Sequence, residues 1–145
     1  MQITEIDLNN KRQVQDFLDL PFHIYKDIHQ WVPPLAGDAR LVLDQNRFPF
    51  YEHSEAAFFI ARQNGTPLGR ICVMDNRRYN DFRGEKTAFF YLFETVDDEA
   101  VSTALFAAAS QWSRARGLNK ILGPHGFTPM DGMGRSPKSK FRFSL

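Results

Sequence analysis

A chain of 145 residues, of which 43% are apolar and 24% charged, has the length and composition of one globular domain, which excludes a disordered chain. Its net charge of +1 gives no general electrostatic reason to bind nucleic acid or an anionic membrane. A single cysteine, Cys72, excludes an internal disulfide, and no apolar run has the length of a membrane span or a signal peptide. These features predict a cytoplasmic protein.

The chain is predicted to begin with a strand and a helix. Residues 2–8 alternate imperfectly between apolar and polar side chains, as in a short strand. Asn10, with Asn9 before it, can cap a helix over residues 11–20. Pro21 is expected to end or break this helix.

An aromatic and proline-rich segment follows. Residues 31–35 (Trp-Val-Pro-Pro-Leu) cannot form an ordinary helix, because two successive prolines remove backbone donors. A second short helix is predicted over residues 38–45, and residues 48–51 (Phe-Pro-Phe-Tyr) close the segment. Two interpretations stay open: a lid packed on the core, or one wall of an acceptor pocket.

A β-hairpin is the clearest local pattern. Residues 56–62 and 68–74 are strand-like, and Asn64-Gly65 between them tolerates the positive φ angles of a tight hairpin turn. The arginine-rich connection 75–84 that follows is predicted to be a loop, either solvated or in contact with an anion.

The rest of the chain is organised around a predicted strand, crossover helix and parallel strand. Residues 86–95 are apolar on both faces, as in a central strand, and residues 97–116 carry a helical apolar stripe that ends at Gly117. Residues 120–122 can pair in parallel with the first strand. Ligands bind at the carboxyl ends of strands in sheets of this kind, which places a candidate site at the start of the helix.

The last residues lack a coherent apolar face. Periodicity ends after Gly126, and residues 135–145 are predicted to be a disordered or non-native tail. The predicted domain therefore spans residues 1–134.

This order of elements resembles the GNAT superfamily of acyl-CoA N-acyltransferases. The resemblance covers roughly residues 3–134 and is closest to the N-terminal part of larger bacterial GNAT-like proteins. Five motifs carry it: Trp31-Val32-Pro33-Pro34-Leu35, Pro49-Phe50, Gly69-Arg70-Ile71, Phe93-Glu94 and Gly123-Pro124. It implies an α/β (α+β) fold, with a mixed central sheet, helices on both faces, and the usual C-terminal strands missing.

The resemblance also implies an acyl-CoA co-substrate, with acetyl-CoA as the usual case. In the superfamily the two parallel strands splay apart, pantetheine enters the gap, and pyrophosphate rests on the amides that open the crossover helix. The signature of Arg or Gln followed by small residues falls here on Asp97, Ala100 and Ser102. The residues expected at the co-substrate are Phe93, Thr95, Val96, Asp97, Ala100, Val101 and Ser102.

Acidic residues at this turn favour a structural role. Thr95 and Asp98 have capping-box spacing, and Asp97, Asp98 and Glu99 lie in the first helical turn, where acids stabilise a helix. A pyrophosphate would meet the same carboxylates, at a cost of roughly 1 kcal/mol or more for each charge about 4 Å away. The pattern predicts a helix that caps itself.

Three residues are candidates for the chemistry of amine acylation. Glu94, at the carboxyl end of the central strand, is the first choice for a general base. His125 is the second choice, and Tyr91 is the candidate acid for the leaving thiolate. Each also has a structural interpretation: a locally hydrogen-bonded carboxylate, a surface histidine and a packing tyrosine.

The histidines His23, His29 and His53 show no metal-ligand spacing, so no metal is expected. Two functions stay open. The first is acyl transfer to a small-molecule or peptide amine. The alternative is a non-catalytic GNAT-like module that binds a partner chain or associates with itself through an uncovered sheet edge, giving a homo-oligomer or a sheet completed by another chain.

Overall fold

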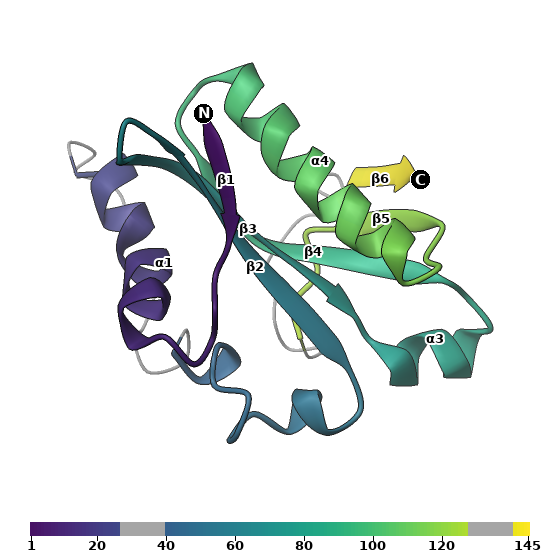
Figure 1. Ribbon diagram of the computed structural model, residues 1–145. Coiled ribbons are helices and arrows are strands. Elements are labelled where there is room, and N and C mark those ends of the chain that lie inside the picture. The colour runs from purple at the N-terminus through teal and green to yellow at the C-terminus, as the bar shows by residue number, and fades with distance from the viewer. Residues whose placement is uncertain (27–39, 128–140) are drawn as a thin grey trace.

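The computed structural model describes residues 1–26, 40–127 and 141–145 (Figure 1). The predicted aromatic loop at 31–35 lies outside the described residues, as does the segment 128–140. Of the helix predicted over 38–45, residues 40–42 are helical, and the chain turns from residue 43 onward.

The core of the fold is one six-stranded mixed sheet, in which the strands lie in their sequence order. Every neighbouring pair is antiparallel except β4 and β5, which are parallel. The strands are β1 (Gln2–Glu5), β2 (Glu55–Gln63), β3 (Thr66–Asp75), β4 (Thr87–Thr95), β5 (Lys120–Gly123) and β6 (Phe141–Ser144).

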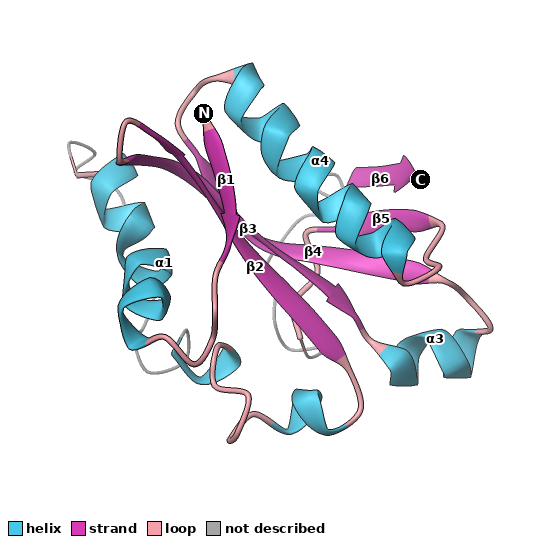
Figure 2. Ribbon diagram, in the orientation of Figure 1, coloured by secondary structure: helices cyan, strands magenta, loops and turns pink. Residues whose placement is uncertain are grey.

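Helices cover both faces of this sheet (Figure 2). In the described part of the chain the labelled helices are α1 (Lys11–Ile24), the 3₁₀ turn η1 (Pro49–Glu52), α3 (Arg77–Arg83) and α4 (Glu99–Ala115). One buried cluster joins α1 to its face of the sheet through Phe17, and the other joins α4 to the opposite face through Leu105. These two surfaces are called the α1 face and the α4 face below.

The hairpin and the β-α-β unit agree with the sequence predictions. Asn64 and Gly65 have φ angles of 51° and 82°, as the tight turn between β2 and β3 requires. The strand, crossover helix and parallel strand are confirmed as β4, α4 and β5. Gly117 has the positive φ of 76° that is expected just after a helix.

The end predicted for the first helix is wrong. Asn10 caps α1 as expected, by accepting hydrogen bonds from Arg12 and Gln13, but the helix continues through Pro21 to Ile24. Proline removes the hydrogen bond that Phe17 would accept within the helix. The carbonyl of Phe17 instead accepts a hydrogen bond of 2.8 Å from Arg70 of β3. This tertiary contact compensates the helix for its missing donor.

The connection after β3 is not a loop but the short helix α3. Asn76 caps its start and Gly84, at φ 64°, follows its end. The buried Asn80 donates to Asp75 and to the carbonyl of Thr87, and accepts from the amide of Thr87, at 2.9 to 3.0 Å. Three hydrogen bonds therefore attach α3 to the ends of two strands.

The C-terminal prediction also needs correction. Residues 141–144 form β6, which pairs with β5 from Lys120↔Ser144 to Gly123↔Phe141, where the sequence predicted a tail without regular structure. The outer edge of β5 is therefore covered within the chain, and the predicted uncovered edge at this position is not observed. The edge strands among the described residues are β1 and β6.

Candidate functional site

The pairing of the parallel strands β4 and β5 ends partway along β4. Three residue pairs hold them together, ending at Phe89↔Leu122, and the amide of His125 then donates to the carbonyl of Phe90 at 2.9 Å. Beyond Phe90, β4 continues to Thr95 and pairs with β3. A Cβ on Gly123 would lie 2.6 Å from the Phe90 carbonyl oxygen, so this last close contact requires glycine. β5 is paired with β4 up to Leu122 and itself ends at Gly123, so the expected splaying of the two strands stays a prediction.

A β-bulge lies in the part of β4 that continues beyond its pairing with β5. Arg70 faces Glu94 and Cys72 faces Tyr91, so β4 has one more residue than β3 in this interval. Leu92, within the bulge, has a φ of 55°, which is rare for a residue with a branched side chain. Bulges next to functional sites change the direction of side chains and free backbone groups.

Arg70 fixes this bulge against α1. Its guanidinium is buried, with 4% of the residue exposed, and donates to the carbonyls of Leu92 at 3.2 Å and Phe17 at 2.8 Å. It also lies over the ring of Phe17, 4.9 Å from the ring centroid. Burial lowers the pKa of Arg70 to about 10, so the group remains a cation at neutral pH. The bulge thus has a buried positive charge beside it.

Glu94 lies on the same face as this cation. It is the cross-strand neighbour of Arg70, and its carboxylate accepts a hydrogen bond from the hydroxyl of Tyr25, which immediately follows α1. Burial, and then the hydrogen bond to Glu94, raise the pKa of Tyr25 to about 12. The phenol therefore stays protonated at neutral pH and holds the half-buried carboxylate in place.

The structure separates the two candidate bases. The ring of His125 stacks on Phe89 at 4.3 Å, and its Nδ1 donates to the carbonyl of Gly126 at 2.8 Å. Phe89 is five residues before Glu94, a distance of roughly 15 Å along an extended strand. Tyr91, the candidate acid, lies between them on the α1 face, with its ring 6.5 Å from that of Phe127.

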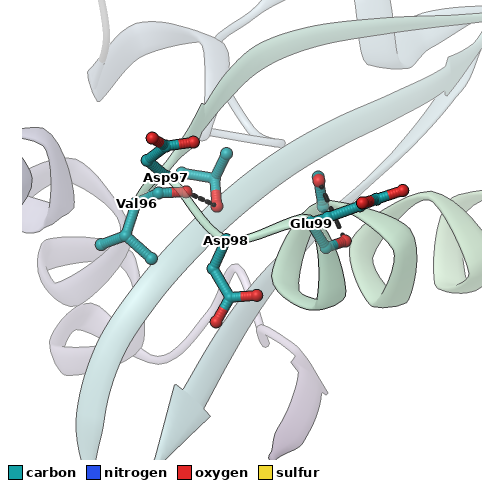
Figure 3. Close-up of a pocket in the computed structure, with 6 residues that line it drawn as sticks. Val96, Asp97, Asp98 and Glu99 are labelled. Carbon is teal, nitrogen blue, oxygen red and sulfur yellow. Dashed lines mark hydrogen bonds between the residues drawn. The ribbon is translucent and has the colours of Figure 1, made fainter.

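The turn between β4 and α4 lines an open cavity of about 440 Å³. Figure 3 shows the exposed carboxylates of Asp97, Asp98 and Glu99 projecting in different directions around it. The cavity is lined by Thr95, Val96, Asp97, Asp98, Glu99 and Ser102, four of which were among the residues expected at the co-substrate.

Helix α4 caps itself at this cavity. The carboxylate of Asp98 accepts from the amide of Ala100 at 2.9 Å, and the carbonyl of Asp98 accepts from the amides of Val101 and Ser102. Thr95 is not the cap, because its hydroxyl donates to the carbonyls of Val96 and Leu68. The capping residue is therefore Asp98 alone, and the expected capping box with Thr95 does not form.

The remaining predicted co-substrate residues lie mostly in the core. Val101 is fully buried in the cluster of the α4 face. Phe93 is half-buried, with its ring 5.0 Å from that of Phe106 in α4. Ala100 is exposed at the start of α4 and contributes its amide to the cap.

Two residues of the site were missed in the sequence. Arg70 appeared in a motif but was assigned no role, although a cation at an inward position of an apolar strand implies buried acceptors. Tyr25 was assigned none because the helix before it was expected to end or break at Pro21. A predicted helix extending to Ile24 would have placed Tyr25 at its C-terminal end, next to the sheet.

Within the described residues, no group of three or more His, Cys, Asp or Glu side chains is placed to hold a metal ion. None of the helices in that part of the chain combines the length and apolarity that crossing a membrane requires.

Comparison with known proteins gives no match to a family model. The chain is 30% identical over 115 residues to protein YghO of Escherichia coli strain K12, covering 79% of this chain and 29% of that protein. It is 29% identical over 123 residues to the bacterial ceramide synthase of Caulobacter vibrioides, covering 84% of this chain and 32% of that protein. The chain therefore spans about a third of the length of these curated relatives.

Solved structures show the same fold at low sequence identity. A tandem GNAT protein from the clavulanic acid biosynthesis pathway superposes with a TM-score of 0.63 and 17% identity, covering 90% of this chain and 40% of that one. An acetyltransferase from Streptococcus agalactiae 2603 gives a TM-score of 0.58 and 21% identity, covering 83% and 70%. An aminoglycoside 6'-N-acetyltransferase complexed with coenzyme A gives 0.57 and 15%, covering 84% and 60%.

Proposed function

We propose that this chain, whose fold is that of the GNAT acetyltransferases, forms the acyl-transfer domain of an N-acyltransferase. The observation that carries the proposal is that β4 continues to Thr95 beyond the end of its pairing with β5, with the carboxylate of Glu94 on this continued part. Solved proteins of this fold include acetyltransferases, one of them in complex with coenzyme A. The thioester of an acyl-CoA substrate would enter between the two strands.

The proposed reaction moves one acyl group from sulfur to nitrogen. Glu94 takes a proton from the ammonium form of the substrate, and the freed nitrogen lone pair attacks the thioester carbonyl carbon. The attacking nitrogen then loses its second proton to water. The carbon–sulfur bond then breaks, and the thiolate takes a proton from Tyr91 or from water. Backbone amides at the Leu92 bulge would stabilise the developing oxyanion. The products are an amide and a free thiol.

Tyr25 and Arg70 would act as positioning residues for this base. Tyr25 donates to Glu94, and the buried guanidinium of Arg70 lies at the cross-strand position opposite it. His125 is the second candidate for the base, and its position near Phe89 makes it the weaker of the two.

We propose an amphipathic amine with a long hydrocarbon chain as the acceptor. The support is the 29% identity to a protein named bacterial ceramide synthase, because a ceramide is the amide of a long-chain amino alcohol. The solved structures of this fold include enzymes for a different amine class, the aminoglycosides, so the fold itself does not select the acceptor.

The turn before α4 fits the diphosphate of coenzyme A poorly. Three carboxylates surround the cavity, and the amides of Ala100, Val101 and Ser102 already have acceptors. Each carboxylate about 4 Å from a phosphate would cost roughly 1 kcal/mol even in bulk water. We therefore expect the donor to bind mainly through its pantetheine and acyl groups.

The test is an assay for amide formation by mass spectrometry with palmitoyl-CoA or acetyl-CoA and a set of amines. Wild type should give amide, and Glu94→Gln should lose at least about a hundredfold in rate, in line with removal of a general base. The matched control, Glu5→Gln, changes an exposed carboxylate in β1 and should keep full activity. Equal rates in wild type and Glu94→Gln would remove Glu94 from the mechanism.

A second candidate function is a non-catalytic module that binds a partner chain. The observation that favours it is the acidic start of α4, where the amides of Ala100, Val101 and Ser102 already donate to Asp98 and are not available to an anion. Thermal melts distinguish the two: a ligand at 100 times its Kd stabilises the fold by ~2.7 kcal/mol. No shift with millimolar acyl-CoA would favour the module.

A further inference from the structure

A second cavity, of about 790 Å³, lies apart from the start of α4, with a lining that is mostly apolar. Its volume falls in the range of roughly 300–1,000 Å³ that is usual for small-molecule sites. Aromatic side chains from three segments of the chain form its walls: Phe48, Phe50, Tyr79, Phe82, His125 and Phe127. This cavity is called the aromatic groove below.

The walls of the aromatic groove are already packed against one another. Phe127 meets Phe50 edge to face at 4.9 Å and Phe48 at 5.3 Å. His125 stacks on Phe89, and the rings of Tyr79 and Phe89 form a T-shaped pair at 4.8 Å. A preformed wall loses little side-chain freedom when a ligand enters, which favours binding.

One aromatic ring at the groove is left in water. Phe82 of α3 is 88% exposed, although it lines the same cavity. An exposed ring beside an apolar cavity marks a surface that gains from contact with an apolar ligand. The apolar lining thus continues from the packed wall to the protein surface.

The charges of the lining residues limit which charge the ligand can carry inside the groove. Among the described residues that line the aromatic groove none is acidic, and Arg78 contributes a cation. Burial and the nearby Arg78 lower the pKa of His53, so this residue is neutral at pH 7. The lining thus suits a hydrocarbon chain whose polar end is neutral or anionic, and disfavours a cationic end inside the groove.

The aromatic groove lies on the same face of the sheet as the candidate base. Phe127 in its wall is 6.5 Å from the ring of Tyr91, and Tyr91 precedes Glu94 by three residues on β4. We infer that the aromatic groove binds the hydrocarbon chain of the long-chain substrate, an inference that rests on the proposed function for the reaction itself. Because the described lining carries the cation Arg78 and disfavours a cationic end, the occupant is the acyl chain of the donor.

Binding of a fluorescent palmitate analogue to the full chain tests this inference. Wild type should bind it, and unlabelled palmitoyl-CoA should displace it. Acetyl-CoA, which has no long chain, should not displace it. Displacement by dodecylamine but not by palmitoyl-CoA would overturn the inference.

Variants on the surface locate the binding. Phe82→Asp places a carboxylate at the mouth and should weaken palmitate binding by about tenfold or more. The control Leu41→Asp changes an exposed apolar residue, 42% exposed, that does not line the groove, and should bind as wild type does. Equal affinity in Phe82→Asp and wild type would overturn the inference.

Two further measurements distinguish a bound acyl chain from a second copy of the protein, and the groove inference from the proposed function. If sedimentation shows a wild-type dimer that Phe82→Asp dissociates, a second copy covers the groove and the inference fails. Glu94→Gln should keep palmitate affinity while it loses amide formation. Palmitate binding without any amide formation would reject the proposed function alone, and transfer to amines without palmitate binding would reject the groove alone.

Discussion

Tyr25 and Glu94, 69 residues apart in the chain, are joined by a hydrogen bond from the phenol to the carboxylate. The bond connects the end of α1 to the bulged half of β4, and Arg70 connects the same two elements through the carbonyls of Phe17 and Leu92. Two contacts thus hold the bulged half of β4, which carries the candidate base, and the one from Tyr25 depends on a helix that continues past Pro21.

Tyr25→Phe should change how stability depends on pH. The pKa of Tyr25 is raised from 10.0 to about 12 in the folded state, so the folded chain holds this proton more tightly than the unfolded chain. Its contribution is complete below pH 10.0 and is lost as pH rises toward 12. Urea unfolding should show a smaller alkaline loss for Tyr25→Phe than for wild type. Parallel curves for the two proteins would contradict the assigned hydrogen bond.

Arg70→Met should destabilise the fold by roughly 2–4 kcal/mol, because two buried carbonyls lose their donor. Arg70→Lys keeps the charge but not the forked geometry, and should lie between Arg70→Met and wild type. Denaturant midpoints measure both. If Arg70→Met unfolds at the wild-type midpoint, the guanidinium does not hold α1 and the bulge together.

Asn80→Ala should cost about 2–3 kcal/mol, because it removes three buried hydrogen bonds between α3 and the ends of β3 and β4. Asp81→Ala, on an exposed position of the same helix, should stay within about 0.5 kcal/mol of wild type. Hydrogen exchange should show faster exchange across α3 in Asn80→Ala. An unchanged unfolding midpoint for that variant would be inconsistent with the buried network.

Neutralising the acids at the start of α4 should strengthen donor binding. The double change Asp97→Asn and Glu99→Gln leaves the Asp98 cap intact and removes two charges that face the cavity. At roughly 1 kcal/mol for each charge, the Kd for acyl-CoA should fall by about tenfold or more at low salt, and by less at high salt. Calorimetry measures this, with the remote Asp81→Asn as the control. Weaker binding in the double variant would mean that these acids help to bind the donor.

Sequence periodicity was sufficient to predict the elements whose local residue pattern is strong. Residues of β4 are apolar on both faces, α4 has a helical stripe over four turns, and Asn64-Gly65 fits only a tight turn. Glu94 was predicted as the base because a carboxylate is unusual at the end of an aromatic strand. The GNAT resemblance in the sequence and the fold of the solved structures agree.

Tertiary contacts explain what the sequence did not reveal. Helix α3 has seven residues and depends on Asn80, and β6 depends on the edge of β5, so neither has a sufficient local signal. Pro21 is compensated by an arginine 49 positions later in the sequence, which no window-based pattern includes. Tyr25 and Arg70 were missed for the same reason, because distant contacts define their roles.

The central claim is that an acyl thioester enters where the pairing of β4 and β5 ends. Amide chemical shifts of isotope-labelled protein, recorded as palmitoyl-CoA or acetyl-CoA is added, test it most directly. The account predicts the largest shifts from Tyr91 to Thr95 and from Gly123 to Gly126, with smaller ones elsewhere in the described residues. Shifts confined to other parts of the chain, or no shifts at millimolar ligand, would contradict it.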